Sequence, residues 1–292
     1  MAMIFYLIVP HKLKENRNKV VIWVLIIFTA MNLSLNNRCA VVCGSTQGIG
    51  LAAARELSSL GATVTLVARN ETALKEALNE LTPPQNGSHG YIVADFSNPE
   101  QLKLALLNWV DNGGKANILI NNTGGPSGGP IADASIDQFE STFRQHLVCN
   151  HILAQTLLPG MKESGYGRIV NVISTSVKQP LKGLGVSNTI RAAVASWAKT
   201  LSLEVAPFGI TVNNVLPGAT STSRLSSLLA NKSSKTGKSV KELELEMISE
   251  IPMARFASPD EIASAIAFLA SPAASYITGI NVPVDGGRTG CL

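Results

Sequence analysis

The chain has 292 residues, of which 46% are hydrophobic and 15% are charged. No Pro/Ser-rich linker divides it, so we expect a single α/β domain rather than two small ones. The formal net charge is +4, but residues 1–38 hold five basic residues against one acidic residue, which leaves the remainder neutral. This charge distribution gives no support for nucleic-acid binding and favours a small-molecule substrate.

The four cysteines, Cys39, Cys43, Cys149 and Cys291, have neither the spacing of metal ligands nor that of a secreted disulfide framework. Two of them fall in segments that we expect to be buried. We therefore interpret them as reduced packing residues of a cytoplasmic protein without a metal site.

The first thirty residues differ from the rest of the chain. An apolar start at residues 4–9 is followed by a basic patch at 12–19 and an apolar run at 20–30. That run has about eleven residues, whereas a bilayer span needs about twenty, and no cleavage site of a secretory signal follows it. We expect residues 1–37 to lie outside the fold, with Met31 as the working start. The alternative is a membrane-surface anchor, and membrane contact is expected only through residues 1–30.

From residue 39 onward the pattern alternates between strand and helix. Apolar runs predict strands at residues 39–43, 62–68, 90–94, 118–120, 168–173, 210–216 and 281–284. Helical periodicity and caps predict helices before Gly61, after Asn98, from Ser135 on to Leu157, at 188–204 and at 259–270. This alternation indicates crossover connections and a doubly wound parallel sheet of the Rossmann type. Ligands in such sheets bind beyond the carboxyl ends of the strands.

The first of these strands ends in a glycine-rich turn, where the chain passes into a helix. The turn has the spacing Gly44-x-x-x-Gly48-x-Gly50 and includes Ser45, Gln47 and Ile49. A side chain at the glycines would keep a diphosphate away from the backbone N–H groups, and the helix N-terminus adds partial positive charge. The turn therefore predicts a dinucleotide site.

The second strand ends in Arg69 rather than in a carboxylate. A carboxylate there would bind the ribose 2′-hydroxyl and repel a 2′-phosphate, whereas an arginine fork, with Ser45 in the turn, suits a phosphate monoester. We predict NADP rather than NAD. The alternative is a solvated arginine at the end of a strand.

In combination, these motifs resemble the short-chain dehydrogenase/reductase family, and in particular the 3-oxoacyl-carrier-protein reductases, over about residues 38–288. The resemblance implies a doubly wound domain at 38–292, a homo-tetramer or dimer, and a substrate lid at about 223–252. It implies cofactor contacts in the glycine turn and at Arg69, Asp95, Phe96, Asn122, Gly124, Arg191, Pro217, Gly218 and Thr222.

The catalytic positions depart from the family pattern. In the family a serine is followed thirteen residues later by the tyrosine of a Tyr-x-x-x-Lys pair. Ser174 matches that serine, but Ser187 stands at the tyrosine position and Arg191 at the lysine position. His146 replaces the helix asparagine that carries the proton-relay water. The resemblance thus implies an NADP(H)-dependent oxidoreductase that acts on a carbonyl or a carbonyl-conjugated double bond with an atypical active site.

The chemistry that remains follows from the groups themselves. A serine hydroxyl is a weaker acid than a phenol and arginine stays protonated, so Ser187 and Arg191 cannot shuttle a proton. Both lie on one helical face, where Arg191 can bind ribose or polarise an oxygen. His146 could supply the proton. Alternatively, Ser187 only caps its helix and His146 is a satisfied polar residue beside the core. The second hypothesis for function is a nucleotide-binding sensor or assembly subunit without turnover.

Two further segments lie on the substrate side. The glycine-rich loop at residues 124–130 would let backbone approach a ligand, or it is an ordinary flexible loop. The polar run at 224–250 matches a substrate lid, or it is a solvated face.

Overall fold

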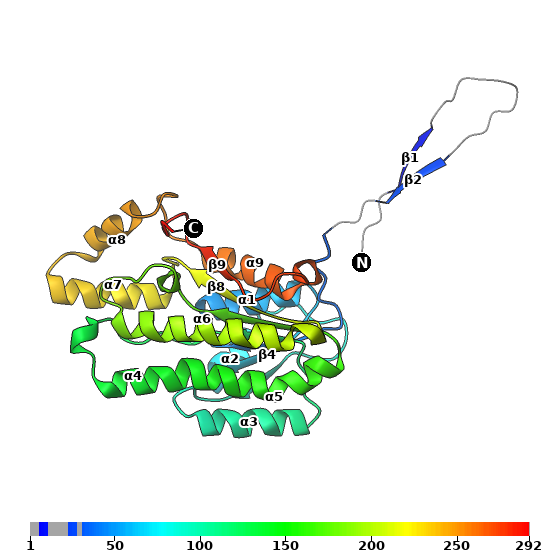
Figure 1. Cartoon of the computed structure of the whole chain (residues 1–292), viewed down its shortest axis with the longest axis horizontal. Coiled ribbons are helices and arrows are strands. Elements are labelled where there is room, and N and C mark those ends of the chain that lie inside the picture. Colours follow the sequence, from blue (N-terminus) through cyan, green and yellow to red (C-terminus); the bar gives the residue numbers. More distant parts are fainter. Residues whose placement is uncertain (1–5, 11–22, 28–30, 292) are drawn as a thin grey trace, which may run out of the picture.

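A computed structural model describes residues 6–10, 23–27 and 31–291. Its main feature is a seven-stranded parallel sheet with the order β5-β4-β3-β6-β7-β8-β9. Helices lie around this sheet (Figure 1). The strands are β3 (Cys39–Cys43), β4 (Thr63–Ala68), β5 (Gly90–Val93), β6 (Ile118–Asn121), β7 (Gly167–Val172), β8 (Ile210–Pro217) and β9 (Asn281–Val284). The order reverses at β3, so the glycine turn lies at the switch point of the sheet, where ligands of this architecture bind.

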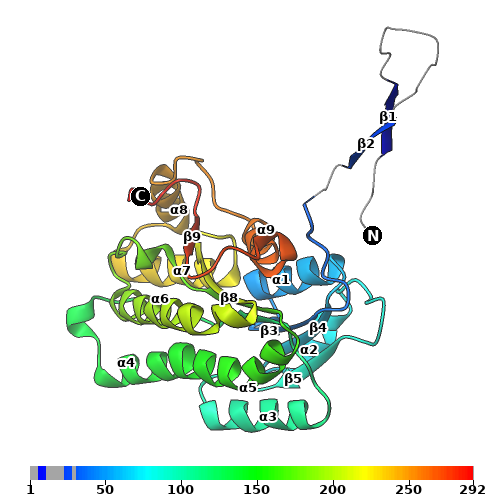
Figure 2. The ribbon, with the colours of Figure 1, turned by 45° about the vertical axis from the view of Figure 1, so that its right-hand side comes forward.

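Helices cover both faces of the sheet, as the alternating pattern predicts (Figure 2). α1 (Gly48–Ser59), α2 (Glu71–Leu78) and α9 (Pro259–Ala270) pack on one face around a first buried cluster. α3 (Pro99–Asp111), α5 (Cys149–Glu163) and α6 (Gly185–Val205) pack on the other face around a second. The doubly wound Rossmann fold in a single domain is therefore confirmed.

A row of asparagine amides joins four neighbouring strands near the carboxyl edge. The Nδ2 of Asn121 donates to Oδ1 of Asn171 at 2.8 Å, and Nδ2 of Asn171 donates to Oδ1 of Asn214 at 2.9 Å. Asn214 continues the row to Asn281 at 2.8 Å. These hydrogen bonds link β6 to β9 in order, while Oδ1 of Asn121, at the start of the row, has no partner among the described residues.

The predicted long helix from Ser135 is interrupted. α4 (Ile136–Phe143) begins at the expected capping box of Ser135 and Gln138, but a π-helical turn, η2 (Arg144–Val148), separates it from α5. A π turn inserts an extra residue and rotates the side chains that follow, which periodicity alone does not reveal. His146 lies in this turn and is 1% exposed.

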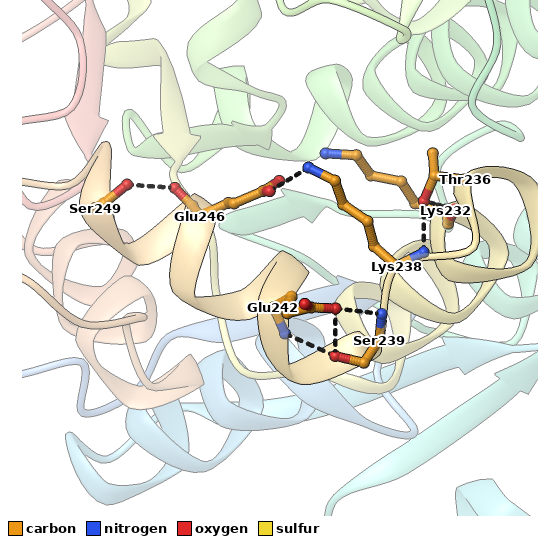
Figure 3. Close-up of polar contacts among 7 residues, drawn as sticks. All are labelled: Lys232, Thr236, Lys238, Ser239, Glu242, Glu246 and Ser249. Carbon is orange, nitrogen blue, oxygen red and sulfur yellow. Dashed lines mark hydrogen bonds and ion pairs between the residues drawn. The ribbon is translucent and has the colours of Figure 1, made fainter.

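The lid segment holds two helices, α7 (Ser223–Thr236) and α8 (Val240–Ser249), of which α7 has no counterpart in the predicted elements. Figure 3 shows the link between them, where Ser239 and Glu242 form a capping box and Lys238 pairs with Glu246. Leu225, Leu229 and Leu243 join the two helices in a small apolar cluster. The segment expected to form a substrate lid is thus a packed helical pair.

At the N-terminal end, β1 (Tyr6–Pro10) and β2 (Trp23–Ile27) form a separate antiparallel pair. The basic patch at residues 12–19 lies outside the described residues. Leu35 is fully buried in the first core cluster and its N–H donates to the carbonyl of Leu60 at 2.8 Å, so the packed domain begins before residue 38, contrary to the expected boundary. Among the described residues, no helix is long and apolar enough to cross a membrane.

Candidate active site

The glycine turn leaves the start of α1 open. Gly44 and Gly48 have φ angles of +58° and +56°, which favour glycine because a Cβ is strained there. Gln47 is the N-cap residue, but its side chain makes no cap hydrogen bond, and the first turn holds no acidic residue. The first N–H groups of a helix have no intrahelical partner, so this end presents donors and positive potential to an anion.

Close packing prevents side chains at the glycines of the turn. A Cβ on Gly50 would lie 2.1 Å from the carbonyl oxygen of Gly44. The Nδ2 of Asn122 donates to the carbonyl oxygens of Cys43 and Gly44, at 3.2 Å each. The loop after β6 is therefore fixed to the turn by the predicted residue Asn122.

The segment after β8 borders the same turn. A Cβ on Gly48 would lie 3.3 Å from Cγ2 of Thr222, and the hydroxyl of Ser223 donates to Oε1 of Gln47 at 3.2 Å. The N–H of Gly218 donates to the carbonyl of Val284 at 2.9 Å, which aligns Pro217 and Gly218 with the end of β9. Residues separated by more than 170 positions in the chain thus form one wall of the site.

The side chains of two expected cofactor contacts are buried. The Ser45 side chain is fully buried, and its hydroxyl oxygen accepts from the N–H of Val67 at 3.1 Å, so it holds the turn to β4 instead of meeting a phosphate. The Phe96 side chain belongs to the core and is 8% exposed. Hydrophobic periodicity could not predict that these two side chains are buried, because their burial depends on contacts with other strands and helices.

Arg69 and Asp95 stand at the nucleotide end of the edge. Arg69 is exposed at the end of β4. A hydrogen bond from the backbone N–H of Ser97, at 2.8 Å, lowers the pKa of the Asp95 carboxyl, and the charge of Arg69 adds to this effect. Arg69 and Asp95 thus both lie at the ends of neighbouring strands, where the resemblance implies cofactor contacts.

On the substrate side, Ser174 follows β7 and its hydroxyl oxygen accepts from the N–H of Ser176 at 3.1 Å. Ser187 lies inside the first turn of α6, whose N-cap residue is Leu184, so the capping interpretation of Ser187 is wrong. The Ser187 side chain is partly buried and makes no hydrogen bond within the described part of the chain. Its hydroxyl is free to face a ligand.

Arg191 is buried, with 9% exposure, and its Nη1 donates to the carbonyl of Val172 at 2.8 Å. Burial lowers the pKa of the Arg191 guanidinium to about 10, and the charge of Arg224 adds to the shift. Arginine remains protonated at neutral pH under these conditions. The site therefore holds a permanent, partly desolvated positive charge where the family lysine would stand.

His146 is not a charged acid in this site. Burial moves the pKa of His146 well below its ordinary value, and the charges of Arg191 and Arg224 lower it further. A hydrogen bond to the backbone of Gly124 acts in the opposite direction. The Nε2 of His146 is buried and has no partner among the described residues. Burial therefore disfavours the charged imidazolium, and of the two ring nitrogens Nε2 is the one without a partner among the described residues.

No sequence pattern singled out Arg224, which lies in the polar run at residues 224–250. It reaches from α7 to donate to the carbonyl of Pro126 in the glycine-rich loop. This loop is held on its other side as well, since Gly129 donates to the carbonyl of Gly183 at 2.7 Å and accepts from Gly185 at 3.2 Å. The loop is an ordered wall of the site, in contrast to the flexible alternative.

A doubly wound sheet with an open glycine turn at its switch point defines a dinucleotide-binding α/β protein. The chain belongs to the short-chain dehydrogenase/reductase family, because a family model described as enoyl-(acyl carrier protein) reductase matches residues 44–289.

Individual relatives agree with this assignment. A chloroplastic tropinone reductase homologue of Arabidopsis thaliana is 34% identical over 258 residues, which cover 88% of this chain and 77% of the relative. The NADPH-dependent reductase BacG of Bacillus subtilis is 29% identical over 87% of this chain and 98% of its own length. The crystal structure of L-sorbose reductase from Gluconobacter frateurii, complexed with NADPH and L-sorbose, is 32% identical and has a TM-score of 0.82 over 90% of this chain and all of that one.

Proposed function

We propose that the protein is an NADP(H)-dependent oxidoreductase that acts on a carbonyl or a carbonyl-conjugated double bond. The observation that carries this proposal is the buried guanidinium of Arg191 at the carboxyl edge of the sheet, beyond the open glycine turn. A fixed, partly desolvated cation stabilises negative charge that develops on an oxygen. The NADPH named for the reductase relatives supports the choice of cofactor.

The residues at this edge of the sheet fit NADP(H), and each would bind a different part of the cofactor. The open N-terminus of α1 would hold the diphosphate, Arg69 the 2′-phosphate, and the wall at Thr222 the nicotinamide end. The nicotinamide supplies or accepts the hydride. Ser174 and Arg191 would hold the substrate oxygen.

We infer that the proton comes from water, because burial disfavours the protonated form of His146 and a serine hydroxyl is a weak acid. Conjugate reduction suits this site better than direct carbonyl reduction. A developing enolate oxygen needs hydrogen-bond donors more than immediate protonation, and Arg191 and Ser174 supply donors.

The second candidate is an NADP-binding sensor or assembly subunit without turnover. The observation that favours it is Ser187, an unbonded hydroxyl where the family has its acid. Binding of NADPH is measured first by protein fluorescence, and NADPH absorbance is then followed with ketones, enals and β-ketoacyl thioesters. Turnover of an enal that is lost in Ser174→Ala, with NADPH affinity retained, supports the enzyme. Tight NADPH binding with no turnover across the panel supports the sensor.

A further inference from the structure

Two arginines on the substrate side lack an acidic partner. Arg191 donates to one carbonyl, that of Val172, and Arg224 donates to one carbonyl, that of Pro126. Within the described residues, neither forms an ion pair with a carboxylate, whereas the surface arginines Arg55, Arg255 and Arg288 each do. The remaining guanidinium N–H groups of Arg191 and Arg224 therefore have no partner in this part of the chain.

This chain satisfies another buried arginine in a different way. The guanidinium of Arg168 donates to three carbonyls, those of Ser271, Gly167 and Gly209, and lies 4.0 Å from the ring centroid of Tyr166. The Nε and Nη1 groups of this buried arginine thus bond to backbone carbonyls, and its guanidinium lies against an aromatic ring. Arg191 and Arg224 are not bonded in this way, which points to a group from outside the chain.

The two guanidiniums also belong to one site. Burial lowers the pKa of each, and the charge of Arg224 acts on both Arg191 and His146. His146 offers an unpartnered, fully buried Nε2 on the same side but no negative charge. Gly125 provides the room for Arg224, since a Cβ there would lie 3.3 Å from its Nη2. The loop that Arg224 contacts at Pro126 is hydrogen-bonded through Gly129 to Gly183 and Gly185, at the start of the helix that carries Arg191. An anion bound on this side of the site would offset both positive charges.

We propose that the substrate carries a carboxylate or equivalent anionic oxygen group, which Arg191 and Arg224 bind together. This inference rests on the proposed function and names the substrate class of its site. Arg224 comes from the lid helix α7 and contacts the glycine-rich loop through Pro126, so the anion joins the lid to the loop. A planar guanidinium fork suits a carboxylate.

The phosphate oxygens of the cofactor could also bind these guanidiniums. The test must therefore distinguish an anion on the cofactor from an anion on the substrate. Arg224 faces Pro126, Arg191 and His146, whereas the open start of α1 faces Thr222 and Ser223. We therefore expect Arg224→Gln to leave NADPH affinity unchanged. A loss of NADPH affinity equal to the loss of carboxylate affinity would assign the anion to the cofactor and overturn the proposal.

The first arm measures binding without turnover. Benzoate and benzamide are titrated by calorimetry into the whole chain saturated with NADP⁺. Benzoate should bind roughly tenfold to a hundredfold more tightly than benzamide, the range expected for hydrogen bonds to a charged group. Arg224→Gln should remove this preference and Arg224→Lys should keep part of it. Lys232→Gln, which neutralises an exposed cation on the same helix, should change neither affinity.

The second arm compares keto acids with their esters as substrates. For pyruvate against methyl pyruvate, and levulinate against methyl levulinate, kcat/KM should favour the acid, and Arg224→Gln should raise KM for the acid with little change for the ester. Equal benzoate and benzamide binding overturns the anion site whatever the activity. Turnover of both acid and ester with no preference overturns it as well, while leaving the proposed oxidoreductase intact.

Discussion

The hydroxyl oxygen of Ser45 accepts a hydrogen bond from the N–H of Val67 at 3.1 Å, so the serine of the glycine turn bonds to the second strand. The side chain is fully buried and cannot reach a 2′-phosphate. Arg69 is exposed and lies two residues beyond Val67. We therefore expect Arg69 to recognise that phosphate.

Arg69→Glu should therefore weaken NADPH far more than NADH, because a carboxylate repels the 2′-phosphate that the guanidinium binds. Affinities for both nucleotides are measured by the change in protein fluorescence, and Arg144→Glu, an exposed site at the start of the π turn, serves as the control. Equal losses for the two nucleotides would show that Arg69 does not select the phosphate.

Gly50→Ala should weaken NADPH binding and lower the free energy of unfolding by about 1 to 3 kcal/mol, the usual cost of overpacking. The added methyl group would lie 2.1 Å from the carbonyl oxygen of Gly44, so the turn has to shift. Urea unfolding and NADPH titration measure the two effects. Gly160→Ala is the matched control, because a Cβ at that helical position meets nothing within 4 Å. Similar losses in both variants would contradict the steric explanation.

Stability should fall with decreasing pH because of His146. Its pKa in the folded protein lies well below the ordinary value of 6.5 that the unfolded chain has. At a pH above 6.5, His146 is neutral in both the folded and the unfolded protein and does not change the free energy of unfolding. Below this pH, the unfolded chain takes up a proton that the folded protein excludes, so the free energy of unfolding falls by up to about 1.4 kcal/mol per pH unit.

Urea unfolding between pH 8 and about pH 5, above the range of most carboxyl groups, isolates this effect. His146→Asn should show a smaller fall than the wild-type chain. His151→Asn, at an exposed position on α5, controls for the loss of an imidazole. Parallel curves for the wild-type chain and His146→Asn would rule out a neutral buried histidine.

The double substitution of Ser187→Tyr with Arg191→Lys places a phenol and an ammonium one helical turn apart on α6. Reduction of simple ketones should rise by about a hundredfold or more, the range of general acid catalysis. The matched control carries Ser187→Phe with Arg191→Lys, which has the same ring without the hydroxyl. A gain of the same size in the control would mean that packing, and not proton donation, changed the rate.

Local signals in the sequence were sufficient for most of the framework. The cap at Asn98 with Pro99, the capping box that begins at Ser258 and the apolar run at 281–284 each depend on neighbours within a few residues, and the helices and strand lie where these signals place them. The glycine turn is an equally local signal, because the spacing of its glycines marks the positions where a side chain cannot fit.

The chemical character of the site was decided by tertiary structure. Whether Ser45 faces a ligand depends on a strand 22 residues away, and the placement of Arg224 depends on a carbonyl 98 residues away. The π turn that buries His146 breaks the periodicity from which its exposure would be predicted. The sequence by itself predicted the dinucleotide turn and aligned Ser187 with the position of the family tyrosine. Only the packed chain decided which side chains are desolvated, and desolvation sets which of them carry charge.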